Sequence, residues 1–196
     1  ALENYRDQLA SFPQTVWVSE DILLDLADSQ TPQGIVAVVQ KEEVGQADFS
    51  QGKFLFLEDV QDPGNVGTII RTADAAGFTG VIVSDKSADI YSLKTLRSMQ
   101  GSHFHLPIYR MSSQALFKGA KKAAIPVLAT TLSKDSVDYR ELPPIENFVL
   151  VMGNEGQGIS PLMAESADQL VHISMKGQAE SLNVAVAAGI LIFHLS

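Results

Sequence analysis

Residues 53–78 read KFLFLEDVQDPGNVGTIIRTADAAGF, and this stretch decides the fold class. It begins with a short apolar run of the kind that forms a buried strand, followed by a turn at Pro63 and Gly64. Apolar side chains then recur at i, i+3, i+4 and i+7, as on the core-facing side of a helix, and Gly77 predicts a left-handed helix end. The sequence therefore predicts a strand, a turn and a helix in succession, with Arg71 outside the apolar stripe.

Two interpretations of this turn remain open at the level of the sequence. In the first, Asn65 is an N-cap and Arg71 is a cation on the helix surface. In the second, the N-terminus of the helix accepts a phosphate, and Arg71 adds bidentate contacts to that phosphate.

From residue 53 onward, strand-like and helix-like runs alternate. The strand-like runs are 54–58, 80–84, 125–131 and 148–152, with shorter ones near 104–108 and 170–173. The helix-like runs are 65–76, 92–100, 112–123 and 182–194. This alternation predicts an α/β fold with a mostly parallel sheet and helices on both faces.

The front of the chain follows a different pattern. Residues 15–28 predict a short strand and then a helix capped by Ser19 or Asp21, and 31–40 predict a turn and a buried strand. The polar stretch 41–52 is typical of a linker. Residues 1–52 carry two basic and nine acidic side chains, so −7 of the total charge of −9 lies there. The chain therefore does not bind nucleic acid by overall charge alone, although residues 53–196 could hold basic patches.

The composition excludes several kinds of site. The 196 residues, 45% hydrophobic and 19% charged, suit one domain or one domain with part of a second. Because cysteine is absent, disulfides and cysteine nucleophiles are excluded. His103 and His105 lack a third ligand, and we expect no metal.

No apolar run approaches the roughly 18 residues of a membrane span and no signal pattern opens the chain, which is compatible with a cytoplasmic location.

Two further segments carry candidate ligand sites. LVMGNEGQGIS, residues 150–160, places three glycines and an Asn-Glu pair directly after an apolar strand. Glycines let a ligand approach the backbone, and open α/β sheets bind ligands at the ends of their strands. The glycine spacing fits neither a dinucleotide fingerprint nor a phosphate loop. VHISMKGQAESLNVAVAAGILIFHL, residues 171–195, ends in an apolar helix that Ser181 or Asn183 could cap.

Together, the three segments resemble the motifs of the TrmH (SpoU) branch of the SPOUT RNA methyltransferases. The matching runs are N-x-G-x-x-x-R-x-A from Asn65 to Ala73, G-N-E-G-x-G-I-S from Gly153 to Ser160, and I-x-M-x-G from Ile173 to Gly177, which leads to S-L-N-V-A-V-A. The resemblance covers about residues 53–196. One departure is Ser174, where the family usually has proline.

The resemblance implies a C-terminal deep trefoil knot, a homodimer and S-adenosylmethionine as the cofactor. It implies RNA as the substrate, ribosomal RNA before transfer RNA, with methylation at a ribose 2′-hydroxyl. Residues 51–196 would be the methyltransferase domain, and residues 1–50 part of a ribosomal-protein-like substrate-binding domain. The implied cofactor contacts are Thr130 (or Thr131), Gly153, Asn154, Gly158, Ile173, Met175, Leu182 and Asn183. The implied catalytic residues are Arg71, Asn65, Glu155, Ser181 and Asn183.

The chemistry of ribose methylation gives Arg71 a role. Arginine is a poor general base, because its pKa lies above ~12. It can clamp the adjacent phosphate, orient the hydroxyl and stabilise developing alkoxide charge, and whether it also accepts the proton stays open. Two other classes compete with this reading: a catalytically silent RNA-binding module of the same fold, and a dinucleotide-dependent oxidoreductase. The presence of Asn65, Arg71, Glu155 and Asn183 counts against the first, and the missing dinucleotide fingerprint counts against the second.

Overall fold

The computed structural model describes residues 9, 12, 14–27, 31–41 and 44–196, and it divides into two compact units at residues 43 and 44. The first unit contains helix α2 (Glu20–Ala27), which begins directly after Ser19 and confirms the predicted helix. The strands predicted at the start of 15–28 and within 31–40 are wrong. Val38 is 99% exposed and Val39 is 66% exposed. An apolar run without a neighbouring strand to pair with does not form a sheet by itself.

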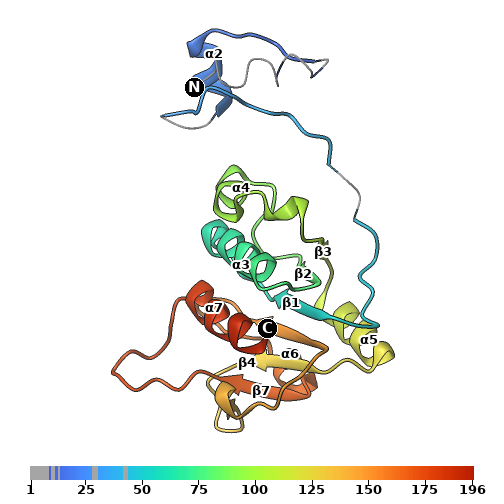
Figure 1. Cartoon of the computed structure of the whole chain (residues 1–196). Helices are drawn as coiled ribbons and strands as arrows, with labels where there is room; N and C mark the ends of the chain where they lie inside the picture. The colour runs from blue at the N-terminus through green and yellow to red at the C-terminus, as the bar shows by residue number, and fades with distance from the viewer. Residues whose placement is uncertain (1–8, 10–11, 13, 28–30, 42–43) are drawn as a thin grey trace. The chain divides into compact units, whose positions relative to one another are not determined.

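The second unit is built on a seven-stranded sheet in which every pair of neighbouring strands is parallel (Figure 1). The order of the strands is β3-β2-β1-β6-β4-β7-β5. Their bounds are β1 Lys53–Leu57, β2 Gly80–Val83, β3 Ile108–Arg110, β4 Val127–Thr130, β5 Val137–Asp138, β6 Phe148–Met152 and β7 Gln169–His172. The predicted parallel α/β sheet is confirmed.

Helices cover both faces of this sheet, and the side chains of its central strands alternate between two hydrophobic cores. Leu55 and Leu57 of β1 pack with α3 (Pro63–Ala75), α4 (Leu93–Met99) and α7 (Val184–Leu195). Phe54 and Phe56 point to the other face and pack with α5 (Ser113–Ala123) and α6 (Pro161–Ser166). Two short 3-10 helices, η2 (Ser102–Phe104) and η3 (Tyr139–Glu141), complete the described elements of this unit.

The end of α3 follows the prediction made for Gly77. Gly77 has a φ of 73°, and its N–H donates to Asp74 O at 3.0 Å. The N–H of Phe78 donates to Ala73 O at 3.0 Å, which completes a Schellman motif, and the Phe78 side chain is buried in the core beside α3. Because glycine takes positive φ without a steric penalty, the chain turns sharply here into β2.

The strand predicted near 104–108 is misplaced. The chain forms η2 first, and β3 begins only at Ile108. Gln100 and Gly101 both adopt positive φ, 51° and 90°, and the N–H of Leu106 donates to Ser102 O at 2.9 Å. These left-handed residues close a compact turn after α4, so the apolar side chains that suggested a strand belong to that turn.

The strand order brings distant segments to one edge of the sheet. Parallel strands share the edge at which their carboxyl ends lie, and β1, β6, β4 and β7 are neighbours. The segments that follow β1, β6 and β7 are therefore close together in space. From β7 the chain runs through residues 173–183 to α7, which packs against α3 (Figure 1). This arrangement is consistent with the knot that the resemblance implies.

Candidate active site

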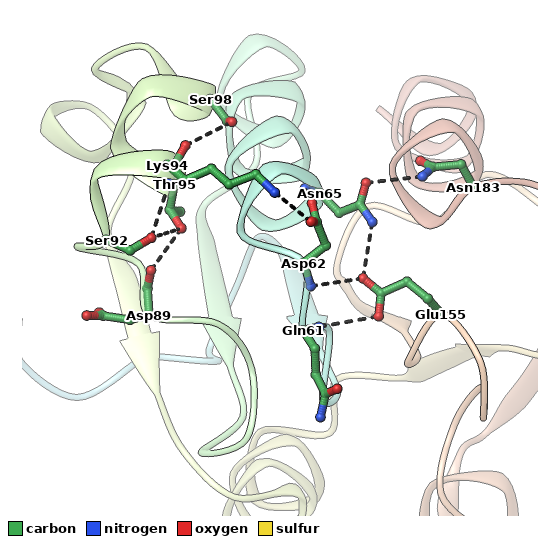
Figure 2. Close-up of polar contacts among 10 residues, drawn as sticks. All are labelled: Gln61, Asp62, Asn65, Asp89, Ser92, Lys94, Thr95, Ser98, Glu155 and Asn183. Carbon is green, nitrogen blue, oxygen red and sulfur yellow. Dashed lines mark hydrogen bonds and ion pairs between the residues drawn. The ribbon is translucent and has the colours of Figure 1, made fainter. Parts of the chain in front are cut away.

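Helix α3 begins at Pro63, and Asp62 is its N-cap. The Asp62 carboxylate accepts a hydrogen bond from the N–H of Asn65 at 2.8 Å, so the interpretation of Asn65 as the N-cap is wrong. Proline is well suited to the first helical position. With Pro63 there, the N-cap is the residue directly before it, Asp62. Lys94 of α4 donates to the same carboxylate at 2.8 Å (Figure 2). The bond from Lys94 and then that from Asn65 N lower the pKa of Asp62.

A chain of polar side chains connects α3, the glycine loop and α7. Figure 2 shows Asn183 Nδ2 donating to Asn65 Oδ1 at 3.1 Å, and Asn65 Nδ2 donating to Glu155 Oε1 at 3.1 Å. Asn183 is also the N-cap of α7, because its Oδ1 accepts from Ala185 N at 2.9 Å and from Val186 N at 3.3 Å. Three predicted catalytic residues, more than a hundred positions apart at their extremes, therefore lie side by side.

Glu155 anchors this chain to the turn before α3. Its two carboxylate oxygens accept hydrogen bonds from Gln61 N and Asp62 N, each at 3.3 Å. Partial burial opposes ionisation, but the Asn65 amide and the backbone N–H donors outweigh it, and the pKa of Glu155 is lowered. The ionised carboxylate thus holds the entrance of α3 against the glycine loop.

Arg71 lies on the exposed side of the same helix. The buried side chains of α3 are those of Val66, Ile69, Ile70 and Ala73, and helical periodicity leaves Arg71 outside this stripe. Its guanidinium makes no hydrogen bond or ion pair with any residue that the structure describes. The group is therefore available to an anionic ligand, as the second interpretation of the turn requires.

The glycine loop after β6 is closed tightly on itself. Asn154 and Gly158 exchange backbone hydrogen bonds of 2.9 Å, and Asn154 Oδ1 accepts from the N–H groups of Gly156 and Gln157. Asn154 Nδ2 donates to Asp59 O at 2.8 Å. A Cβ on Gly153 would lie 2.4 Å from the carbonyl carbon of Gly158, so only glycine fits there. The Asn154 side chain is therefore occupied in shaping the loop.

Glu58 is a structural residue of this site that sequence reasoning missed. It is 4% exposed, and its Oε1 accepts from Ser113 Oγ at 2.8 Å and from Ser160 Oγ at 2.7 Å. Its Oε2 accepts from Ser160 N at 2.8 Å. The carboxylate thus fixes the end of the glycine loop to β1 and α5. The available signal was an acidic residue that directly follows an apolar strand.

A cavity of about 430 Å³ opens between the glycine loop and residues 171–191. Small-molecule sites commonly have this volume. Every predicted cofactor residue except Asn183 lines this cavity: Thr130, Gly153, Asn154, Gly158, Ile173, Met175 and Leu182. The predicted catalytic residue Ser181 lines it too. Asn183 lies between two lining residues, Leu182 and Val184. Glu180 also lines the cavity and was not among the predicted residues.

The lining fits a ligand with both an apolar ring and charged groups. Ile173, Met175 and Leu182 supply apolar surface for a flat ring, and Thr131 and Glu180 supply polar groups. The loop glycines let such a ligand contact the backbone directly. The residues present therefore suit S-adenosylmethionine, in which a positively charged sulfonium joins adenosine to a zwitterionic amino-acid tail.

The described residues show neither a metal site nor a membrane span. Within them, no three His, Cys, Asp or Glu side chains lie close enough together to hold a metal ion. His105 instead lies 3.3 Å from Asp74 of α3. In the described part of the chain, no helix has the length and apolar character needed to cross a bilayer.

Comparison with known proteins identifies the family. The model of the SpoU rRNA methylase family matches residues 52–193. The 23S rRNA (guanosine(2553)-2'-O)-methyltransferase RlmP of Bacillus subtilis is 44% identical over 182 residues, which cover 93% of this chain and 72% of that protein.

Solved structures agree with this match. The AdoMet-bound rRNA methyltransferase of Sinorhizobium meliloti superposes with a TM-score of 0.81 at 33% identity, over 99% of this chain and 76% of the other. The SpoU methyltransferase AviRb of Streptomyces viridochromogenes gives a TM-score of 0.83 at 30% identity, over 97% of this chain and 76% of the other. The chain described here therefore belongs to the SpoU rRNA methylase family.

Proposed function

We propose that this chain methylates a ribose 2′-hydroxyl of ribosomal RNA, with S-adenosylmethionine as the methyl donor. The observation that carries the proposal is the cavity beside the Asn183–Asn65–Glu155 chain, because it places a cofactor-sized site next to the helix that bears Arg71. Membership in the SpoU family supports the reaction class. The relative RlmP, whose name specifies 23S ribosomal RNA and 2′-O-methylation, supports the substrate.

The chain's own residues have separate tasks in this reaction. When bound, S-adenosylmethionine supplies an electrophilic methyl group on a positively charged sulfur, which becomes a neutral thioether as the 2′-oxygen takes the methyl group. Arg71 binds the neighbouring phosphate and stabilises the negative charge that develops on the 2′-oxygen as its proton passes to solvent. Asn65, Glu155 and Asn183 hold the entrance of α3 against the loops that line the cavity, and so set the position of Arg71.

A transfer assay with a stated chemical signature tests the proposal. The protein would be incubated with ribosomal RNA and S-adenosylmethionine that carries a radioactive methyl group, with transfer RNA as a parallel substrate. Because a 2′-O-methyl group removes the nucleophile of alkaline cleavage, we expect the label in an alkali-resistant dinucleotide from ribosomal RNA. Label on a base, or label only in transfer RNA, would contradict the corresponding part of the proposal. Because the described residues contain no cluster of His, Cys, Asp or Glu side chains that could hold a metal ion, we expect activity to survive a metal chelator.

We further infer a homodimer that uses the exposed side of α7. Val186 is 53% exposed and Phe193 is 59% exposed, whereas Ile192 is fully buried in the core. Closed twofold dimers are the commonest soluble assemblies, and their interfaces are apolar at the centre. Light scattering is expected to give about twice the chain mass of 21.1 kDa.

The Phe193→Glu variant tests this surface. It should bring the measured mass down to 21.1 kDa, because a charge would replace the largest exposed apolar side chain of α7. Phe104→Glu is the matched control, since Phe104 is 68% exposed but belongs to η2 and not to α7, and the variant should leave the dimer intact. A monomeric wild-type protein at micromolar concentration would overturn the inference.

The front unit is expected to be dispensable for cofactor binding. All residues of the cavity lie beyond position 129, and the chain folds into separate units at residues 43 and 44. Deletion of residues 1–43 should therefore leave the calorimetric affinity for S-adenosylmethionine unchanged. The cut precedes Phe49, which is buried and packs on Phe54 with ring centroids 5.0 Å apart, so deletion through residue 50 should cost stability. Loss of cofactor binding in the shorter deletion would refute this expectation.

A further inference from the structure

The segment between β7 and α7 forms part of the lining of the cofactor cavity, but few side-chain hydrogen bonds fix it in place. Ile173, Met175 and Leu182 line the cavity, and the chain has no helix or strand from 173 to 183. The structure describes all of residues 174–182, and within them only Ser174 has a side chain that makes a hydrogen bond. Between Ile173, which packs against the core, and Asn183, which caps α7, this hydroxyl is thus the one side-chain hydrogen-bonding group that holds residues 174–182.

The partner of this hydroxyl is a carboxylate that is itself fixed. Ser174 Oγ donates to Asp138 Oδ2 at 2.5 Å, and Asp138 is only 8% exposed. Arg140 binds both oxygens of Asp138, through Nε at 2.7 Å and Nη2 at 2.8 Å. The Arg140 guanidinium and then the Ser174 hydroxyl hold the pKa of Asp138 well below its usual range. Hydrogen bonds to an ionised acceptor are about twice as strong as neutral ones.

Asp138 is the main acceptor of the hydrogen bond that the Ser174 hydroxyl donates. Ser174 Oγ also lies 3.3 Å from His172 Nε2, while His172 Nδ1 lies 3.0 Å from Ser136 Oγ. The Ser136 hydroxyl donates to Ser133 O at 2.5 Å, so it must accept from His172 Nδ1. In a neutral ring Nε2 is then an acceptor, and the single proton of Ser174 goes to the nearer and charged Asp138.

We propose that Asp138 is a positioning residue for cofactor binding, acting through Ser174 on the segment 173–175 of the cavity. A proline at position 174, usual in the family that the sequence resembles, would stiffen this segment by fixing its own φ. In this chain the Ser174–Asp138 bond supplies the restraint instead. The inference rests on the proposed function, because it presumes that the cavity binds S-adenosylmethionine.

Calorimetric titration of S-adenosylmethionine and of its demethylated product tests the proposal. We expect Ser174→Ala to raise Kd for both compounds about tenfold, which is the usual worth of a hydrogen bond to a charged group. Ser174→Thr, which keeps the hydroxyl, should bind as the wild type does. Ser174→Pro should recover most of the affinity by stiffening the backbone. In the transfer assay, KM for the cofactor should rise in Ser174→Ala while kcat changes little.

Asp138 is tested separately because its loss also releases Arg140. Asp138→Asn should weaken cofactor binding, and the Ser174→Ala/Asp138→Asn double variant should be no weaker than the poorer single variant, since both changes remove one shared bond. Asp135→Asn is the control: it neutralises an exposed carboxylate of the loop between β4 and β5 that makes no hydrogen bond or ion pair with a described residue.

The outcomes separate the two proposals. A wild-type protein that binds neither compound refutes the proposed function. A wild type that binds, together with a Ser174→Ala variant of equal affinity, overturns only the positioning role. Should Asp138→Asn fail to fold, the Ser174 series alone decides the matter.

Discussion

Replacement of Arg71 by alanine is expected to lower kcat for methyl transfer by about 10²–10³, the usual cost of removing a donor that stabilises developing negative charge. Arg71 is exposed and lies on α3, whereas every residue of the cofactor cavity comes from position 130 or later. Affinity for S-adenosylmethionine should therefore stay at the wild-type value. The checks are single-turnover transfer for the rate and calorimetry for the affinity.

Two further variants test whether the loss of rate is specific to the guanidinium of Arg71. Arg71→Lys keeps the charge but loses the planar, bidentate donor pair, so it should recover only part of the rate. Arg97→Ala removes a cation from the neighbouring helix α4 and should leave the rate near wild type. An Arg71→Ala enzyme that works at the normal rate would return Arg71 to the role of a surface cation.

Replacement of Gly153 by alanine is expected to weaken cofactor binding about 10- to 100-fold, in line with the cost of overpacking a tight site. The new Cβ would lie 2.4 Å from Gly158 C, 2.5 Å from Ile159 N and 2.6 Å from Gly158 O. All three are backbone atoms, so the loop itself has to move. Both Gly153 and Gly158 line the cavity, and its shape changes with them. Calorimetry of S-adenosylmethionine binding measures the effect.

Gly177→Ala is the matched control for this substitution. Gly177 lies in the segment before α7, its Cβ would meet no atom within 4 Å, and its φ is not in the left-handed region. We expect normal cofactor affinity and normal thermal stability in this variant. Equal losses in both variants would mean that the tight packing at Gly153 is not what shapes the cavity.

The hydrophobic periodicity of the sequence was sufficient to predict the main helices and strands of the second unit. Its long apolar runs become β1, β6, α3 and α7, because burial of an apolar stripe or of a whole strand leaves a direct mark on the pattern. β5 has two residues and α6 has six, too short for any period to appear. In the front unit, apolar runs alone suggested two strands, but the described residues of that unit form no strand with which either could pair.

The candidate site was predictable as a set of motifs but not as a network. The sequence placed Asn65, Glu155 and Asn183 in three separate segments, and only the strand order brings these segments together. One of the two interpretations of the turn made Asn65 the cap of α3, because asparagine caps helices well, yet Asp62 followed by Pro63 satisfies the same rule better. Glu58 and Asp138 were not predicted, because a single buried acidic residue leaves no periodic pattern in the sequence. Their roles become visible only from the serines that donate hydrogen bonds to them in the structure.

Helix α7 has two different surfaces, and this has a thermodynamic consequence. Val184, Ala187 and Leu191 line the cofactor cavity, while Val186 and Phe193 are exposed on the side inferred to meet a second copy of the chain. A ligand that binds one side of a short rigid helix and a partner that binds the other side are linked equilibria, and their coupling is reciprocal. Whatever factor separates the cofactor affinities of the monomer and the dimer, saturating cofactor should change the association constant by that same factor.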